Sequence, residues 1–274
     1  MPLRVGLVQL KPSASRDENL RQARAWSVEA TADGADLLVL PEYFGDLFGV
    51  NADPRDPAHP PEILGEGPIS RFLSELASEL GVTVHGGSFL ERDGERVYNT
   101  TAIFDPSGAV VAVYRKQHPF SCPAAPTGSG DAESDFIAAG SQPAIYEVKD
   151  LRVGCATCWD LRFPSLFEDY RRRGCSFVVC PAAFFAGVPT DTAFWESLLR
   201  GRAIDLGGYV ACATVVGTMP EAKEPRGAIS FHGVTRLIDP FGHVVAKGED
   251  GGPCGIRAEL RLSRIKEANE NHPA

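Results

Sequence analysis

Short apolar runs and helical spacings alternate along the chain, and turn residues separate them. Residues 36–40 form a continuous run, mostly of leucine and valine, that ends at Pro41, which is typical of a strand covered on both faces. Apolar residues then recur at helical spacing between residues 69 and 80, and Gly81 suits the end of that helix. The chain therefore combines buried strands with amphipathic helices.

Hairpin signals follow that helix, because Asp93-Gly94 and Ser107-Gly108 separate three stretches that read as strands. Ser15 and Glu18 have the spacing of a capping box at the start of an earlier helix. The expected strands cover residues 5–10, 36–40, 82–90, 96–104, 109–115, 151–157, 176–180, 209–216, 234–238, 243–246 and 255–259. The expected helices are the segment between Ser15 and Gly34 and residues 69–80, 164–173, 192–206 and 262–269.

A long loop rich in small residues is expected at residues 117–142. Loops of this length inside compact domains tend to be functional or disordered. No change in composition marks a linker, and no repeat with a period of about 20–50 residues is present. We therefore expect residues 1–274 to form a single α/β domain, with mixed sheets that helices cover.

Composition and charge exclude several classes of protein. The 274 residues are 43% hydrophobic and 23% charged, close to the average for globular proteins. The net charge of −9 argues against nucleic acid or an anionic membrane as a general partner, since both would attract the opposite sign. No apolar run approaches the roughly 18 residues of a membrane-spanning helix.

The seven cysteines are scattered, and several lie in apolar stretches, which is typical of free, buried thiols in a reducing compartment. The first residues lack the layout of a signal peptide, so we expect a cytoplasmic protein. The chain has no second C-x-x-C, no H-x₃₋₅-H pair, no G-x-G-x-x-G and no P-loop. We therefore expect no metal and no nucleotide cofactor.

Three polar residues follow directly on expected strands, where ligands usually bind in α/β folds. They are Glu42, Lys116 and Cys158. The cysteine stands at a strand-to-helix junction, where amide groups and the helix dipole would lower its pKa and hold an oxyanion. A carboxylate can accept the thiol proton, and a lysine can stabilise a tetrahedral intermediate. Together they predict acyl transfer without a metal.

Other interpretations of these residues remain open. Taken singly, each is more often a solvated turn residue, an edge charge or a small core residue than a catalytic group. Cys155 and Cys158 have the spacing of a redox pair, although period-two alternation points Cys155 to the other face of the sheet. His118 is a second candidate for the base that would activate Cys158.

Three motifs in order give the chain a specific resemblance. They are Leu38-Val39-Leu40-Pro41-Glu42, Tyr114-Arg115-Lys116-Gln117-His118 and Cys155-Ala156-Thr157-Cys158-Trp159-Asp160 with Leu161-Arg162-Phe163-Pro164. They resemble the signatures of the nitrilase, or carbon–nitrogen hydrolase, superfamily, and are closest to its omega-amidase-like branch. Supporting matches run nearly end to end and include Asn99-Thr100, Pro181-Ala182-Ala183-Phe184 and Asp239-Pro240-Phe241-Gly242.

The resemblance implies a role for each motif residue. Cys158 would be the nucleophile, Glu42 the general base and Lys116 the cation on the oxyanion side. The backbone N–H of Trp159 would complete the oxyanion hole, and Glu133 would position groups or relay a proton. The implied fold is α/β (α+β), a four-layer α-β-β-α sandwich. The implied assembly is a homodimer or a larger homo-oligomer, and apolar-faced helices such as residues 163–170 favour it.

We therefore expect an amidase that hydrolyses a small linear amide to a carboxylate and ammonia through a cysteine thioester. The alternatives are an N-carbamoyl amine hydrolase or a nitrilase of the same fold, a catalytically silent binding or scaffold protein, and a dithiol oxidoreductase. Phe194, Pro119 and Val234 depart from residues common in relatives, so the shape of the substrate pocket and the identity of the amide stay open. We expect Asp160 and Arg162 to form a structural ion pair near the nucleophile.

Overall fold

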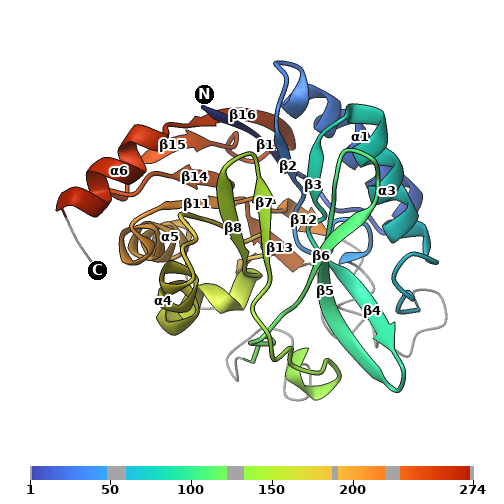
Figure 1. Cartoon of the computed structure of the whole chain (residues 1–274). Helices are drawn as coiled ribbons and strands as arrows, with labels where there is room; N and C mark the ends of the chain where they lie inside the picture. Colours follow the sequence, from blue (N-terminus) through green and yellow to red (C-terminus); the bar gives the residue numbers. More distant parts are fainter. Residues whose placement is uncertain (1, 48–59, 122–132, 187–190, 220–228, 272–274) are drawn as a thin grey trace.

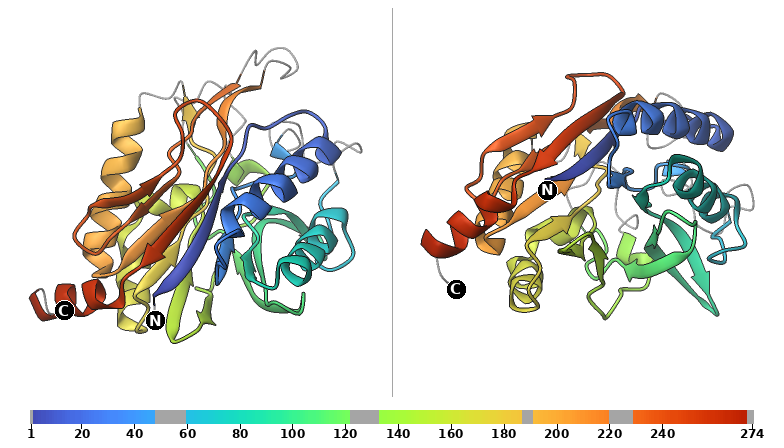
Figure 2. Two further views of the ribbon diagram at one scale, coloured as in Figure 1. Left: turned by 90° about the horizontal axis from the view of Figure 1, so that it is seen from above. Right: turned by 45° about the horizontal axis from the view of Figure 1, so that its top comes forward.

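Two mixed β-sheets lie face to face, and helices cover the outer face of each (Figure 1, Figure 2). This computed structural model describes residues 2–47, 60–121, 133–186, 191–219 and 229–271. Within those residues, the first sheet has the strand order β16 (Cys254–Leu260), β1 (Leu3–Gln9), β2 (Leu37–Val39), β3 (Thr83–His85), β5 (Arg96–Phe104) and β4 (Phe89–Asp93), and β6 (Val110–Arg115) pairs with β5.

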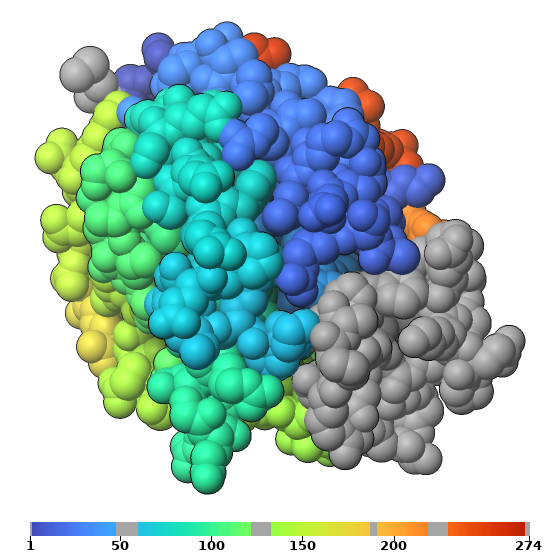
Figure 3. Space-filling model, turned by 90° about the vertical axis from the view of Figure 1, so that its right-hand side faces the viewer, coloured from blue at the N-terminus to red at the C-terminus, as the bar shows by residue number. Residues whose placement is uncertain are grey.

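The second sheet has the order β15 (Val244–Lys247), β14 (Arg236–Ile238), β11 (Tyr209–Cys212), β9 (Phe177–Val179), β8 (Leu151–Cys155) and β7 (Ile145–Val148). A small sheet is formed by β10 (Phe185–Ala186), β13 (Ile229–His232) and β12 (Val216–Met219). Helices α1 (Arg16–Thr31) and α3 (Pro68–Leu80) cover the first sheet, and α4 (Pro164–Arg172) and α5 (Thr192–Leu206) cover the second. Figure 3 shows α1 in blue beside α3 in cyan on one side of the molecule. Helix α6 (Leu262–Asn271) follows the last strand.

Alternation along the central strands produces the four layers. In β2, Leu37 and Val39 face the core between the sheets, whereas Leu38 packs under α1 and α3. In β9, Val179 faces the same central core, whereas Val178 packs under α4 and α5. Successive side chains of a strand point to opposite faces, so a strand buried on both sides reads as a continuous apolar run. The four-layer α-β-β-α sandwich expected from the sequence is confirmed.

Most element boundaries agree with the sequence, and α5 spans the expected residues 192–206. The expected strand 82–90 is wrong, because the chain bends between β3 and β4. Gly87 has a φ of 58°, and a Cβ there would lie 2.0 Å from the carbonyl oxygen of Pro41. The bend thus makes room for the segment that follows β2. The capping box of α1 is half formed: Ser15 accepts the N–H of Glu18, whose carboxylate binds Arg21 and Gln22 instead.

Several short elements were not expected. The strand predicted at residues 209–216 divides into β11 and β12, and β7, β10 and β13 were missed. The predicted loop 117–142 contains the 3₁₀ helix η1 (Glu133–Asp135), while its residues 122–132 lie outside the described part of the chain. No helix within the described residues has the length and hydropathy needed to span a bilayer.

The apolar face of α4 is used inside the subunit. Leu166, Phe167 and Tyr170 are buried in the cluster between α4, α5 and the second sheet. This face was expected to support association between copies of the chain, and that argument is wrong because its side chains already have partners.

Candidate active site

Segments that follow strands of both sheets bring the expected catalytic side chains together. Glu42 follows β2, and Lys116 directly follows β6. Cys158 begins the 3₁₀ helix η2 (Cys158–Arg162) after β8, and Glu133 begins η1. All four side chains are buried, and each is 7% exposed or less.

Lys116 joins the two carboxylates. Its Nζ lies 2.9 Å from Glu42 Oε1 and 2.7 Å from Glu133 Oε2. The charges of Glu42 and Lys116 both act on the thiol of Cys158, the first raising and the second lowering its pKa. The thiol, the two carboxylates and the ammonium that were predicted as site residues therefore share one buried cluster.

Neighbouring groups satisfy the remaining carboxylate oxygens. Asn99 Nδ2, on β5, donates to Glu42 Oε1 at 3.0 Å and to Glu133 Oε1 at 2.8 Å. The Ala183 N–H donates to Glu42 Oε2 at 2.8 Å, and the Tyr43 hydroxyl donates to Glu133 Oε1 at 2.5 Å. None of these three donor residues was assigned a role from the sequence. A polar amide inside the apolar strand 96–104 was the signal available for Asn99.

Burial and neighbouring charges fix the protonation of the cluster. Burial alone would lower the pKa of Lys116, but the Glu133 and Glu42 carboxylates raise it well above its usual value. Burial likewise opposes ionisation of Glu133, but Lys116, the Phe120 N–H and Tyr43 lower its pKa. The lysine is therefore an ammonium and Glu133 a carboxylate at neutral pH.

The expectation of a lowered thiol pKa at Cys158 is wrong. Burial, followed by the charge of Glu42, raises the pKa of Cys158 well above its usual value, and Lys116 opposes this only in part. The helix η2 has five residues and a 3₁₀ geometry, so its dipole is small. In the free site Cys158 is a neutral thiol, and its proton must leave as it attacks.

The backbone around the nucleophile is held in an unusual conformation. Cys158 has a φ of 49° and Tyr43 a φ of 52°, both in the left-handed region that non-glycine residues rarely adopt. The Cys158 N–H donates to the carbonyl of Pro181 at 2.9 Å. The next amide, that of Trp159, donates to no group within the described residues. A free N–H thus lies beside the thiol.

Comparison with known proteins agrees with this geometry. The family model described as carbon–nitrogen hydrolase matches residues 4–270. The chain belongs to the carbon–nitrogen hydrolase family. Omega-amidase NIT2 of Bos taurus is 33% identical over 270 residues, which cover 98% of this chain and 92% of that protein.

Solved structures support the same family. Nit3 of Saccharomyces cerevisiae, a member of branch 10 of the nitrilase superfamily, matches with a TM-score of 0.81 at 26% identity, over 99% of this chain and 94% of that one. A carbon–nitrogen hydrolase from Helicobacter pylori G27 has the same fold, with a TM-score of 0.84 at 23% identity over 100% and 94% of the two chains. The expected resemblance and the expected class of enzyme, a hydrolase of non-peptide carbon–nitrogen bonds, are confirmed.

The expected ion pair between Asp160 and Arg162 is absent from the described part of this carbon–nitrogen hydrolase. The Asp160 carboxylate accepts hydrogen bonds from Tyr114, His118 and Thr157. The Arg162 guanidinium lies over the Trp159 ring, 4.6 Å from its centroid, and also faces Phe194. That expectation is wrong because the carboxylate points into the protein, whereas the arginine side chain follows the exposed aromatic surface.

Aromatic residues surround the nucleophile of the hydrolase. Half-buried Phe120 contacts Trp159 edge to face at 4.9 Å and Phe185 at 5.7 Å. The unusual Phe194 packs edge to face on Trp195 at 5.2 Å. Val234 is fully buried in the same cluster as Cys158, and Phe194 packs against that cluster. Both side chains therefore belong to the apolar surroundings of the thiol and not to the charged cluster.

The two cysteines of the C-x-x-C spacing lie in different cores of the hydrolase. Cys155 is in the central core between the sheets, whereas Cys158 is in the cluster under α4 and α5. Both are free thiols, so the geometry gives no support to a dithiol mechanism. His118 is directed to Asp160 and stacks on Phe163 with a centroid distance of 3.6 Å, which removes the support for it as the base.

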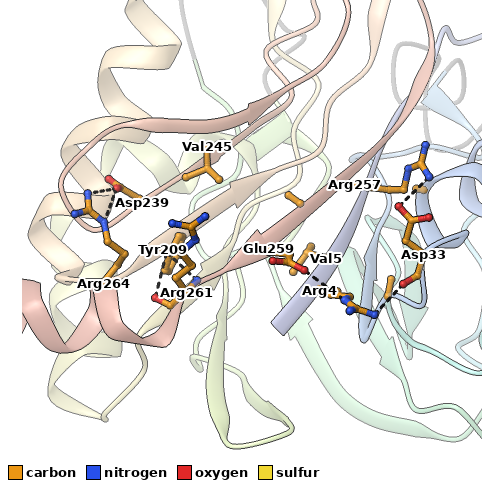
Figure 4. Close-up of a pocket in the computed structure, with 13 residues that line it drawn as sticks. Arg4, Val5, Asp33, Tyr209, Asp239, Val245, Arg257, Glu259, Arg261 and Arg264 are labelled. Carbon is orange, nitrogen blue, oxygen red and sulfur yellow. Dashed lines mark hydrogen bonds and ion pairs between the residues drawn. The ribbon is translucent and has the colours of Figure 1, made fainter. Parts of the chain in front are cut away.

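An open cavity of about 650 Å³ lies away from this cluster, between β1, β16 and α6 (Figure 4). Its charged residues largely pair with one another: Arg257 binds Asp33, Arg4 lies 3.5 Å from Glu259, and Arg264 binds Asp239. No group of three metal-ligating side chains was found among the described residues.

Proposed function

We propose that this carbon–nitrogen hydrolase is an amidase, which hydrolyses a small linear amide to a carboxylate and ammonia through a thioester on Cys158. The observation that supports the proposal is the buried cluster in which Lys116 bridges Glu42 and Glu133 beside the thiol. The omega-amidases among the relatives are consistent with this activity.

Family membership and the exposed Ile204 on α5 favour a homodimer or a larger assembly.

The reaction begins with proton transfer from the Cys158 thiol to Glu42 as the sulfur attacks the amide carbonyl carbon. The carbonyl electrons move to oxygen, and the Lys116 ammonium and the Trp159 N–H stabilise the oxyanion. Protonated Glu42 then gives its proton to the amide nitrogen as the carbon–nitrogen bond breaks. Ammonia leaves, and an acyl thioester remains on Cys158.

Water completes the cycle. Glu42 accepts a proton from water as the water oxygen attacks the thioester carbonyl, and the same cation and amide stabilise the second oxyanion. The carbon–sulfur bond breaks, and protonated Glu42 returns its proton to the sulfur of Cys158. The acid leaves and gives its own proton to the solvent, so the product is a carboxylate. Glu133 does not contact the substrate in this scheme; it holds Lys116 and Asn99 in place.

Ammonia release from a panel of small amides tests the proposal, with Cys158→Ala as the control. We expect turnover of at least one amide by the wild-type chain and none by the variant. Release only from N-carbamoyl amines or from nitriles would replace the amidase by one of those two activities. No turnover of any class would favour a binding or scaffold protein.

The expected homodimer is tested by sedimentation, where a single species of about 29 kDa at micromolar protein would exclude it.

A further inference from the structure

The Asp160 carboxylate is the acceptor for four hydrogen bonds, and its side chain is wholly buried. Oδ2 accepts the Tyr114 hydroxyl at 2.7 Å and the Thr157 N–H at 2.9 Å. Oδ1 accepts the His118 N–H at 3.0 Å and the His118 Nδ1 at 2.7 Å. An ionised carboxylate offers about four lone-pair positions and no donor, so all of its capacity is used here.

These partners come from the two segments that carry the proposed catalytic groups. Tyr114 and His118 stand two residues before and two residues after Lys116. Thr157 directly precedes Cys158. One buried carboxylate therefore ties the end of β6, which bears the ammonium, to the turn that bears the thiol.

A second connection joins the same segments. The His118 ring stacks on Phe163 with an interplanar angle of 9°, and the Phe163 N–H donates to the Asp160 carbonyl at 3.0 Å. The turn also contains the left-handed Cys158, a conformation that is unfavourable for residues other than glycine and persists only when neighbours hold it. The hydrogen bonds of Asp160 are among the contacts that hold Cys158 in this conformation.

We propose that Asp160 is a positioning residue that sets the placement of the Cys158 thiol relative to the Lys116 ammonium. It contacts neither the thiol nor the ammonium, and acts through Thr157, Tyr114 and His118. The inference rests on the proposed amidase function. A displacement of about 1 Å at a reacting group can cost on the order of 100-fold in rate, so loss of this tie has a large kinetic effect.

Asp160→Asn is the central variant, because an amide group presents its NH₂ to donors that need an acceptor. Asp239→Asn is the matched control. Asp239 is 4% exposed and accepts the N–H groups of Phe241 and His243 and the guanidinium of Arg264, beside the cavity of Figure 4. Both variants remove a buried carboxylate with several donors, but only one of these carboxylates lies next to the nucleophile turn.

We expect Asp160→Asn to lower kcat roughly 10- to 100-fold with KM nearly unchanged, whereas Asp239→Asn loses stability and keeps its kcat. Equal losses of kcat in the two variants, or a wild-type kcat in Asp160→Asn, would overturn the proposal. Should Asp160→Asn fail to fold, Tyr114→Phe removes a single hydroxyl from the tie. It is expected to lower kcat with KM unchanged, and an unaltered kcat would overturn the proposal.

A measurement that requires no amide hydrolysis separates this inference from the proposed function. The rate at which iodoacetamide alkylates Cys158, followed by mass spectrometry against pH, reports the surroundings of the thiol. We expect the profile to change in Asp160→Asn and to stay at wild type in Asp239→Asn. Identical profiles in all three proteins would refute the positioning role, whereas a wild-type chain inactive on every amide would refute only the amidase.

Discussion

The Lys116 ammonium lies 2.9 Å from the Glu42 carboxylate, and both side chains are almost wholly buried. Glu133 lies on the other side of the same ammonium, so two carboxylates face one cation and the cluster carries a net negative charge. This charge opposes ionisation of the adjacent Cys158, as does burial. We therefore expect attack by the sulfur to be coupled to transfer of its proton, and Glu42 is the neighbouring carboxylate whose charge acts on the thiol.

Replacement of Lys116 tests whether its ammonium compensates the charges of Glu42 and Glu133. Lys116→Ala leaves two buried carboxylates without their cation, so we expect activity to be lost and the free energy of unfolding to fall by about 3–5 kcal/mol. Lys266→Ala is the control, since that side chain is 79% exposed and its removal should change stability by about 0.5 kcal/mol or less. Thermal unfolding and ammonia release measure both effects. A normal melting curve with normal turnover in Lys116→Ala would contradict the assignment.

The two cysteines of the C-x-x-C spacing form a natural pair of variants. Cys158→Ala should reduce turnover to background and keep the fold, because it removes the nucleophile. Cys155→Ala should keep most of the activity and lose on the order of 1 kcal/mol of stability through a small cavity in the central core. Active-site titration and urea unfolding distinguish them. Loss of activity in both variants, with a dependence on added oxidant or reductant, would instead indicate a dithiol mechanism.

The catalytic residues could be predicted from the sequence because each follows a strand in a local motif. Glu42, Lys116 and Cys158 are recognisable without knowledge of how the strands pair. Asn99 was not assigned a role, because its partners Glu42 and Glu133 are 57 and 34 residues away and meet it only after the sheets form. The Ala183 N–H contact, made over 141 residues, is of the same kind.

Properties that depend on opposing effects could not be predicted from the sequence either. Burial and the charge of Glu42 raise the pKa of Cys158, and Lys116 lowers it. The sequence-based argument considered only the effect of a helix N-terminus. The bend at Gly87 could not be predicted from alternation, because its cause is the close approach of Pro41, which lies in the segment that follows β2. The four layers were implied by the family resemblance, and the apolar run at residues 36–40 is consistent with them because it predicts a strand buried on both faces.

Glu42→Gln tests the proton acceptor while keeping the shape of the side chain. We expect kcat to fall by ~10²–10⁴-fold, since the amide cannot accept the thiol proton. Because the charge of Glu42 helps to raise the pKa of Cys158, its removal should lower that pKa, and we also expect faster alkylation by iodoacetamide in this variant at neutral pH. Mass spectrometry during turnover shows which step has stalled. Wild-type kcat in Glu42→Gln would assign the base to another group.

Removal of metals provides a further check. The sequence has no spacing typical of a metal site, so turnover should survive incubation with EDTA and should be abolished by iodoacetamide. Ammonia release before and after each treatment measures this. Activity that EDTA abolishes and zinc restores would contradict acyl transfer by Cys158, because it would make a metal ion part of the reaction.

His85 makes stability depend on pH. This residue of β3 is fully buried, neither ring nitrogen has a partner within the described residues, and burial lowers its pKa from 6.5 to about 3. Between these two values the unfolded chain binds a proton that the folded chain does not. The stabilisation is therefore complete above about pH 6.5 and is lost, by up to about 1.4 kcal/mol per pH unit, as the pH falls toward 3.

His85→Leu removes this titration, so we expect its free energy of unfolding to decline less steeply than that of the wild type between pH 6.5 and pH 4. The other titratable groups are the same in both proteins, so their contribution to the pH dependence is removed when the two free energies of unfolding are subtracted. Urea unfolding at several pH values measures the slopes of the two proteins. Parallel curves for His85→Leu and the wild type would mean that His85 is protonated in the folded protein, which its burial without a hydrogen-bond partner opposes.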